Sequence, residues 1–249
     1  MLSDDNRQAA LDALEQARPV MVKKLLDEVY AEAFWQVRFG SLGRMHAEQD
    51  ANYHLDNLIV ALRFDLDSST AQHYQWLRNV LVKRGMCTRH LRRTLDSLQR
   101  LIAETLPAEW PAIQPYLLQG YTGLACTHPA CQALAAQEQS IARAVTEKMA
   151  AGSPQSAAAG ADLLQGATRL EEILCHLSYL QDAIEQDAPQ MFTAHVEWLA
   201  GYLARHTPTP AVLYAELRWL AQEIETRLAP QDAAPFLQLL EQTQVRRFF

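Results

Sequence analysis

The chain carries HLDNLIVAL at residues 54–62 and HLSYLQDAI at residues 176–184, and both segments space apolar residues three and four positions apart. This spacing places the apolar side chains on one face of an α-helix. Only nine of the 249 residues are glycine, the usual turn residue of β proteins, and we identify no segment with a strand-like alternation of apolar and polar residues. We therefore expect an all-α fold.

The two segments lie 122 residues apart, and their alignment extends without a gap from residues 50–107 to residues 172–229. Fourteen of the 58 aligned positions are identical. Besides leucines, these include two histidines and a tryptophan in the same register, namely His54/His176, His73/His195 and Trp76/Trp198. We therefore expect a tandem duplication of a helical bundle, with about five helices per copy.

The duplication predicts two helical bundles, copy 1 at residues 1–125 and copy 2 at residues 126–249. Residues 151–162 are rich in small residues and are expected to form a flexible segment within copy 2. Each copy is long enough to form its own core, but helical repeats also bury each other's faces. Two separate bundles and one core shared by both copies are therefore both possible arrangements.

Proline and glycine mark the expected helix boundaries. A first helix should run to about Arg18, where Pro19 ends it or opens the next. Gly40 and Gly43 should break the second helix. The segment CTHPAC at residues 126–131 lacks a second pair of ligands for zinc, and we read it as a loop before a helix that begins at Pro129.

Several classes of protein are excluded by the bulk composition. The net charge of −7 disfavours a nucleic-acid partner, because phosphate contacts need clustered lysine and arginine. No apolar run approaches the length of a membrane span, and the acidic start of the chain does not resemble a secretory signal. We expect a cytoplasmic protein. Its one basic cluster, at residues 83–93, is expected to be a solvated helix face or a site for an anion or an acidic partner.

The histidines are the main candidates for chemistry. Counted from the loop at residues 65–69, His54 lies about 17 Å along its helix and His73 about 8 Å along the next. This difference argues against a direct contact, although both side chains can line one pocket. They are either structural or cofactor-binding. The candidate cofactor-binding residues are His54, His73, Trp76, His176, His195 and Trp198.

A carboxylate precedes the first histidine of each copy by four residues, one helical turn away. The candidate metal ligands are accordingly Asp50, His54, Glu172 and His176, and the alternative is a structural pair at a bundle edge. The spacing differs from the Glu-x-x-His motif of di-iron bundles. A tetrapyrrole needs only an axial histidine and an apolar pocket, so the cofactor candidates are a tetrapyrrole and a transition metal. We identify no catalytic residue, because phosphate-binding loops, nucleophile elbows and H-E-x-x-H are missing from the sequence.

The string H-L-x-x-L-x-x-A, followed by H-x-x-W-L-x-x-x-L and L-x-x-x-L-x-x-L, resembles a helical module found beside sensory or cobalamin-binding domains in bacterial proteins. The resemblance covers about 58 residues of each copy. The cobalamin signature D-x-H-x-x-G is absent from the sequence. The resemblance implies a regulatory or ligand-sensing role, and it assigns no functional residue.

Three functions follow as hypotheses. The first is a non-enzymatic ligand-sensing, carrier or adaptor protein with a duplicated binding unit for a small ligand or a protein. The second is a metal- or tetrapyrrole-dependent helical enzyme that uses the Asp/Glu–His pairs. The third is a protein–protein scaffold, which includes a homo-oligomer. A visible spectrum and a metal analysis of the purified protein separate the second hypothesis from the others.

Overall fold

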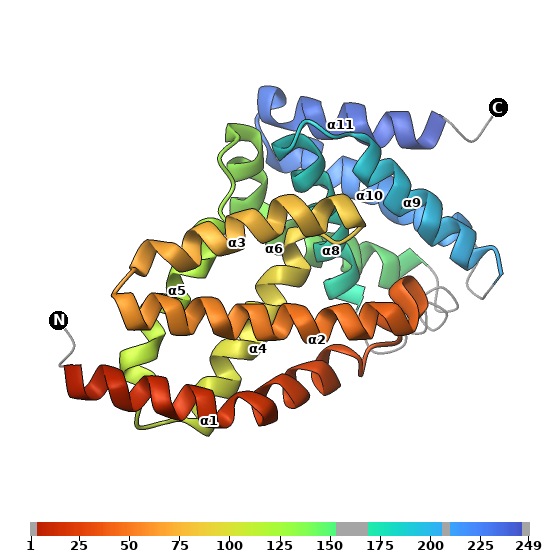
Figure 1. Ribbon diagram of the computed structural model, residues 1–249. Coiled ribbons are helices and arrows are strands. Elements are labelled where there is room, and N and C mark those ends of the chain that lie inside the picture. Colours follow the sequence, from red (N-terminus) through yellow and green to blue (C-terminus); the bar gives the residue numbers. More distant parts are fainter. Residues whose placement is uncertain (1–3, 153–168, 206–209, 246–249) are drawn as a thin grey trace. The chain divides into compact units, whose positions relative to one another are not determined.

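The computed structural model describes residues 4–152, 169–205 and 210–245. These residues form ten α-helices and one short 3-10 helix, without a strand among them, which confirms the all-α prediction (Figure 1). None of the described helices combines the length and apolar character needed to cross a membrane. The chain divides into a first unit, residues 1–80 and 90–125, and a second unit, residues 81–89 and 126–249.

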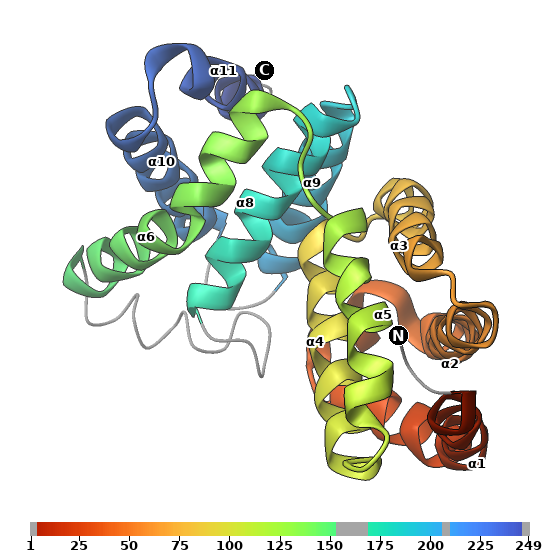
Figure 2. The same ribbon diagram turned by 90° about the vertical axis from the view of Figure 1, so that its left-hand side faces the viewer.

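The first unit is built from five helices in chain order. They are α1 (Asp4–Val29), α2 (Ala33–Phe64), α3 (Asp67–Leu81), α4 (Thr88–Thr105) and α5 (Trp110–Gly123). Helices α1 and α2 run side by side (Figure 1), and α4 lies beside α5 (Figure 2). Among the core residues, Leu55, Leu58 and Leu62 lie on the apolar face of α2 that the sequence predicted.

Helix α1 does not end near Arg18, contrary to our expectation, and Pro19 lies inside it. A proline in a helix removes one backbone hydrogen bond, which disfavours this position locally. Apolar residues on both sides of Pro19 are nevertheless buried, including Leu14 before it and Met21 after it. Packing of both segments in the first unit therefore outweighs the local penalty.

Helix α2 contains a kink at Gly40, where φ is 63° and ψ is −161°. The residues before and after Gly40 are both helical, so the expected break is a kink rather than the end of the helix. Only glycine adopts such a backbone conformation readily. Gly43 lies in the continuous helix that follows the kink, so the expected break of the helix at Gly43 is not found.

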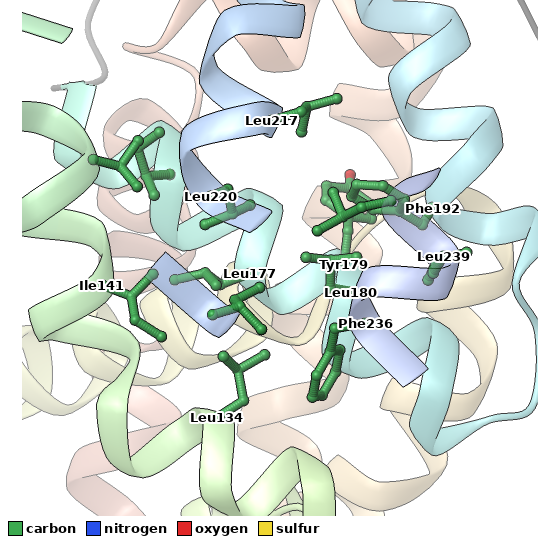
Figure 3. Close-up of a cluster of buried hydrophobic side chains, with 14 of the residues drawn as sticks. Leu134, Ile141, Leu177, Tyr179, Leu180, Phe192, Leu217, Leu220, Phe236 and Leu239 are labelled. Atoms are coloured by element: carbon green, nitrogen blue, oxygen red, sulfur yellow. The ribbon is translucent and has the colours of Figure 1, made fainter. Parts of the chain in front are cut away.

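The second unit also has five described α-helices. They are α6 (Pro129–Gly152), α8 (Arg169–Glu185), α9 (Gln190–Leu203), α10 (Pro210–Arg227) and α11 (Pro230–Val245). Side chains from all five meet in one core that includes Leu134, Leu177, Phe192, Leu220 and Phe236 (Figure 3). Helix α6 begins at Pro129, as the sequence predicted. The segment expected to be flexible, residues 151–162, lies almost entirely outside the described residues.

The segment Leu81–Arg89, which we expected in copy 1, belongs to the second unit and packs on α8. Asp182 accepts hydrogen bonds from the backbone N–H of Thr88, at 2.6 Å, and from its hydroxyl, at 2.5 Å. The next residue, Arg89, donates its backbone N–H to Ser178 and forms a two-pronged ion pair with Glu171. Asp182 therefore caps the first turn of α4 from another helix.

Replacing Asp182 with alanine should lower the free energy of unfolding of the second unit by about 2–4 kcal/mol, because it leaves the buried N–H and hydroxyl of Thr88 without their acceptor. Urea unfolding followed by circular dichroism measures this loss. Ser178→Ala is the control, since it removes only one neutral hydrogen bond and should cost about 1 kcal/mol. Equal effects of the two substitutions would contradict the capping role of Asp182.

Candidate functional site

His54 on α2 and His73 on α3 are in direct contact in the first unit. Nδ1 of His54 lies 3.4 Å from Nε2 of His73, and the two rings are arranged edge to face. We expected no such contact, and that prediction is wrong. The turn between the helices is only Asp65 and Leu66, so the two histidines lie about 15 Å and 9 Å from it. The reach of two imidazole side chains spans the remaining difference.

The environment of the first pair keeps both rings neutral. His54 is buried and stacks on Tyr74, with a ring separation of 5.1 Å. Burial, together with the neighbouring His73, lowers the pKa of His54 to about 3. Burial also lowers the pKa of His73 to about 4. At neutral pH one ring therefore donates an N–H and the other accepts it.

His176 on α8 and His195 on α9 form a second pair through the same two atoms. Nδ1 of His176 lies 3.1 Å from Nε2 of His195, and both residues are buried. His195 stacks on Tyr179, with ring centroids 3.7 Å apart. Burial and the nearby charge of Arg169 lower the pKa of His176 to about 4. His176 is thus also neutral at pH 7.

A buried ionic cluster adjoins the second pair. Nη1 of Arg169 contacts Glu172 at 2.8 Å and Glu216 at 3.3 Å, and Oε1 of Glu216 lies 3.5 Å from Nε2 of His176. Burial raises the pKa of Glu172 to about 8 and that of Glu216 to about 7, although Arg169 opposes the shift in both cases. One arginine thus faces two carboxyl groups that retain protons near neutral pH.

Two arrangements of protons satisfy the contacts of His176, and they differ in which of its ring nitrogens donates. If Nε2 of His195 donates to Nδ1 of His176, the remaining proton of His176 is on Nε2, which faces Glu216. The chain His195–His176–Glu216 then joins α9, α8 and α10 through polar contacts. This arrangement orients buried side chains that hydrophobic packing alone would leave free to rotate.

The predicted metal ligands do not assemble into a preformed site. Asp50 and His54 lie one turn apart on α2, and Glu172 is already bound to Arg169. In the part of the chain that the structure describes, none of the four predicted ligands belongs to a cluster of three ligand side chains close enough to share one ion. The geometry therefore adds no support to the metal hypothesis, which stays a prediction.

The two tryptophans of the predicted cofactor site lie in different environments. Trp76 is exposed on α3, whereas Trp198 is half-buried and stacks on Tyr202 in the second unit. Trp76 therefore does not line a tetrapyrrole pocket in this structure, because its ring is exposed to solvent.

Surface grooves elsewhere among the described residues lie apart from these side chains. A groove of about 440 Å³ along α1 and α2 includes Arg18, Lys23 and Arg44, and each of these cations is paired with a carboxylate. Another, of about 340 Å³, includes His128 and Asp187. None of the predicted site residues lines either groove.

Sequence reasoning missed Arg169 and Glu216. A signal for Glu216 was present, because it occupies an inward position beside Leu213, Leu217 and Leu220 on the apolar face of α10. Glutamate at such a position predicts a buried partner. Arg169 gives no comparable signal, since it follows a segment without clear periodicity.

Comparison of the chain with protein-family models, with curated proteins and with solved structures finds no match. The functional interpretation therefore depends on the geometry of the two units.

Proposed function

We propose that the chain is a non-enzymatic adaptor, built by tandem duplication of a five-helix unit, that binds a second protein molecule through α2 of its first unit. The proposal has a structural part, which is the duplication, and a functional part, which is protein binding at α2. The two parts of the proposal have separate support.

Structural equivalences at an offset of 122 residues support the duplication. Helix α4 spans Thr88–Thr105 and α10 spans Pro210–Arg227, so both bounds differ by this offset. Among the described residues, the only non-glycine positions with positive φ are Asp65 (54°) and Asp187 (47°), each at the turn after the helix that carries the first histidine. The two histidine pairs repeat with the same offset and through the same ring atoms.

The observation that carries the adaptor function is an apolar stripe on α2. All large hydrophobic side chains that are exposed in the described chain belong to the first unit, and most of them lie on α2. We define the α2 stripe by five residues on one helix face, with exposed fractions between 41% and 66%: Leu42, Met45, Tyr53, Val60 and Phe64. On this face the exposed polar residues Gln49 and Asp56 alternate with the large apolar side chains. Large apolar side chains gathered on one exposed helix face, with polar residues among them, favour a protein-binding site.

The equivalent face of α8 supports this interpretation by contrast. At the positions 122 residues beyond Tyr53, Val60 and Phe64, the second unit has Cys175, Asp182 and Gln186. Asp182 is fully buried there, because the segment Leu81–Arg89 covers this face. In the second unit this face is therefore covered by residues 81–89, whereas in the first unit the equivalent face presents apolar side chains to solvent.

The histidine pairs favour a non-enzymatic role. His54, His176 and His195 are buried, and in both pairs a ring nitrogen faces the other histidine rather than a groove. A general base must lie within hydrogen-bond reach of its substrate. These pairs instead join α2 to α3 and α8 to α9, which is a structural task.

Photo-crosslinking in the cells that express the protein tests the adaptor function. We expect benzoylphenylalanine in place of Tyr53 or Phe64 to give discrete covalent adducts with a protein. The same group in place of Val20, an exposed apolar residue on α1, is the matched control and should give none. Absence of adducts at both stripe positions, or equal adducts at Val20, would refute the proposal.

A further inference from the structure

The α2 stripe carries an inference about its partner, which depends on the proposed function. We propose that the partner at the stripe is a second copy of this chain, with the two α2 helices packed antiparallel across a twofold axis that passes beside Tyr53. Cyclic dimers of this kind are the most common soluble homo-oligomers, and both copies contribute the same surface to them.

The order of residues along the stripe supports twofold pairing. Leu42 and Phe64 each lie 11 residues from Tyr53, in opposite directions, which corresponds to three helical turns. Met45 and Val60 lie eight and seven residues from Tyr53. In an antiparallel pair, Leu42 therefore meets Phe64 of the second copy, Met45 meets Val60, and Tyr53 meets Tyr53. Each large apolar side chain faces another.

The charges beside the stripe are compatible with this contact. Asp56 is paired with Arg18 at 2.5 Å, and Arg63 with Glu15 at 3.1 Å, both within the first unit. Bringing two stripes together does not require either charge to find a new partner. Burying an unpaired charge would have opposed association.

The size of the stripe is also sufficient. From Leu42 to Phe64 the helix rises about 33 Å. Two stripes with their flanking side chains would bury on the order of 1,000 Å² in total, which is about the threshold for a biological interface. Four of the six side chains at the centre and the two ends of the paired stripes are aromatic, namely Tyr53 and Phe64 of each copy. Aromatic residues are enriched in protein interfaces.

The mass of the purified chain in solution tests the dimer. Light scattering at micromolar concentration should give twice the 28.1 kDa of one chain. Tyr53→Glu and Phe64→Glu should each give the mass of one chain, because they place charges in the apolar contact. Val20→Glu is the control for an added exposed charge and should stay dimeric. Circular dichroism confirms that each variant is folded. A monomeric wild-type chain would overturn the inference.

Engineered cysteines test the antiparallel register. Under mild oxidation, Tyr53→Cys should form a disulfide between two copies, because this position lies at the axis. Leu42→Cys alone and Phe64→Cys alone should not, but a mixture of the two should form the heterotypic disulfide. The wild-type chain, with its four native cysteines, is the background control. Homotypic disulfides at Leu42→Cys and Phe64→Cys would indicate parallel helices and overturn the proposed pairing.

The dimer and the adaptor function fail in distinguishable ways. Photo-adducts at Tyr53 with a different protein, together with a monomeric purified chain, would overturn the dimer and leave the adaptor function standing. The lack of any stripe-specific adduct in a monomeric chain would overturn both.

Discussion

At pH 4.5 we expect the first unit to be markedly less stable than at pH 7, and the second unit to be at least as stable. The first unit contains His54 and His73, whose pKa values are lowered to about 3 and about 4 by burial. In the unfolded chain a histidine takes up a proton near pH 6.5. Stability is therefore lost as the pH falls from 6.5 towards the folded pKa, and His54 alone accounts for about 2 kcal/mol between pH 6.5 and 4.5.

The second unit contains opposing groups. His176 has a folded pKa of about 4, so it also loses stability on acidification. Glu172 and Glu216 have raised pKa values of about 8 and about 7. A carboxyl group with a raised folded pKa costs stability as the pH rises from about 4.5 through that pKa, and this stability is regained as the pH falls. The two glutamates therefore regain at least as much stability in acid as the one histidine loses.

Hydrogen exchange measured by mass spectrometry, corrected for the intrinsic pH dependence of exchange, distinguishes the units. Peptides from α2 should lose protection between pH 7 and 4.5, whereas peptides from α8 should keep it. The double variant Glu172→Gln with Glu216→Gln is the control, since it removes the opposing carboxyl groups and should make α8 acid-sensitive. Equal acid sensitivity of α2 and α8 in the wild-type chain would contradict the assignment.

Replacing Gly123 with alanine should destabilise the first unit by about 3 kcal/mol or more. A Cβ atom at this last residue of α5 would lie 2.1 Å from the backbone carbonyl oxygen of Ala71 on α3. No side chain can rotate to relieve this overlap, so the two helices must separate, and overpacking typically costs about 1–3 kcal/mol even where side chains can adjust. Urea unfolding of the variant measures the loss.

Gly201→Ala is the matched control. Gly201 lies inside α9, and a Cβ atom there has nothing within 4 Å. Alanine in a helix interior is favoured over glycine, so this substitution should raise the free energy of unfolding by about 0.5–1 kcal/mol. Two glycine-to-alanine substitutions in helices should thus have opposite signs. A loss in both variants would show that the close approach of α3 and α5 is not the cause.

Periodicity in the sequence was sufficient to predict the helices and many core residues. Leu55, Leu58 and Leu177 are buried where the apolar spacing placed them. Such patterns report burial because one helix face packs against its neighbours along its whole length. The same reasoning failed at Pro19, where packing on both sides of the residue outweighs a local preference.

The polar contacts could not be predicted from spacing along one helix. The His54–His73 contact depends on the length of the turn and on the reach of both side chains. The contact of Glu216 with His176 joins residues 40 positions apart on different helices. The exposure of Trp76 likewise depends on which face of α3 packs in the first unit. These features arise from tertiary structure, which residue spacing does not encode.

The segment Leu81–Arg89 has a consequence for dividing the protein into fragments. The chain passes between the two units three times, after residues 80, 89 and 125. Cutting the chain once after residue 125 therefore leaves neither unit intact. The N-terminal fragment keeps residues 81–89, which belong to the second unit. The C-terminal fragment loses Thr88, whose hydrogen bonds Asp182 accepts in the whole chain. The second unit therefore depends on residues 81–89, and a fragment that begins after residue 125 lacks the contacts of Thr88 and Arg89 with α8.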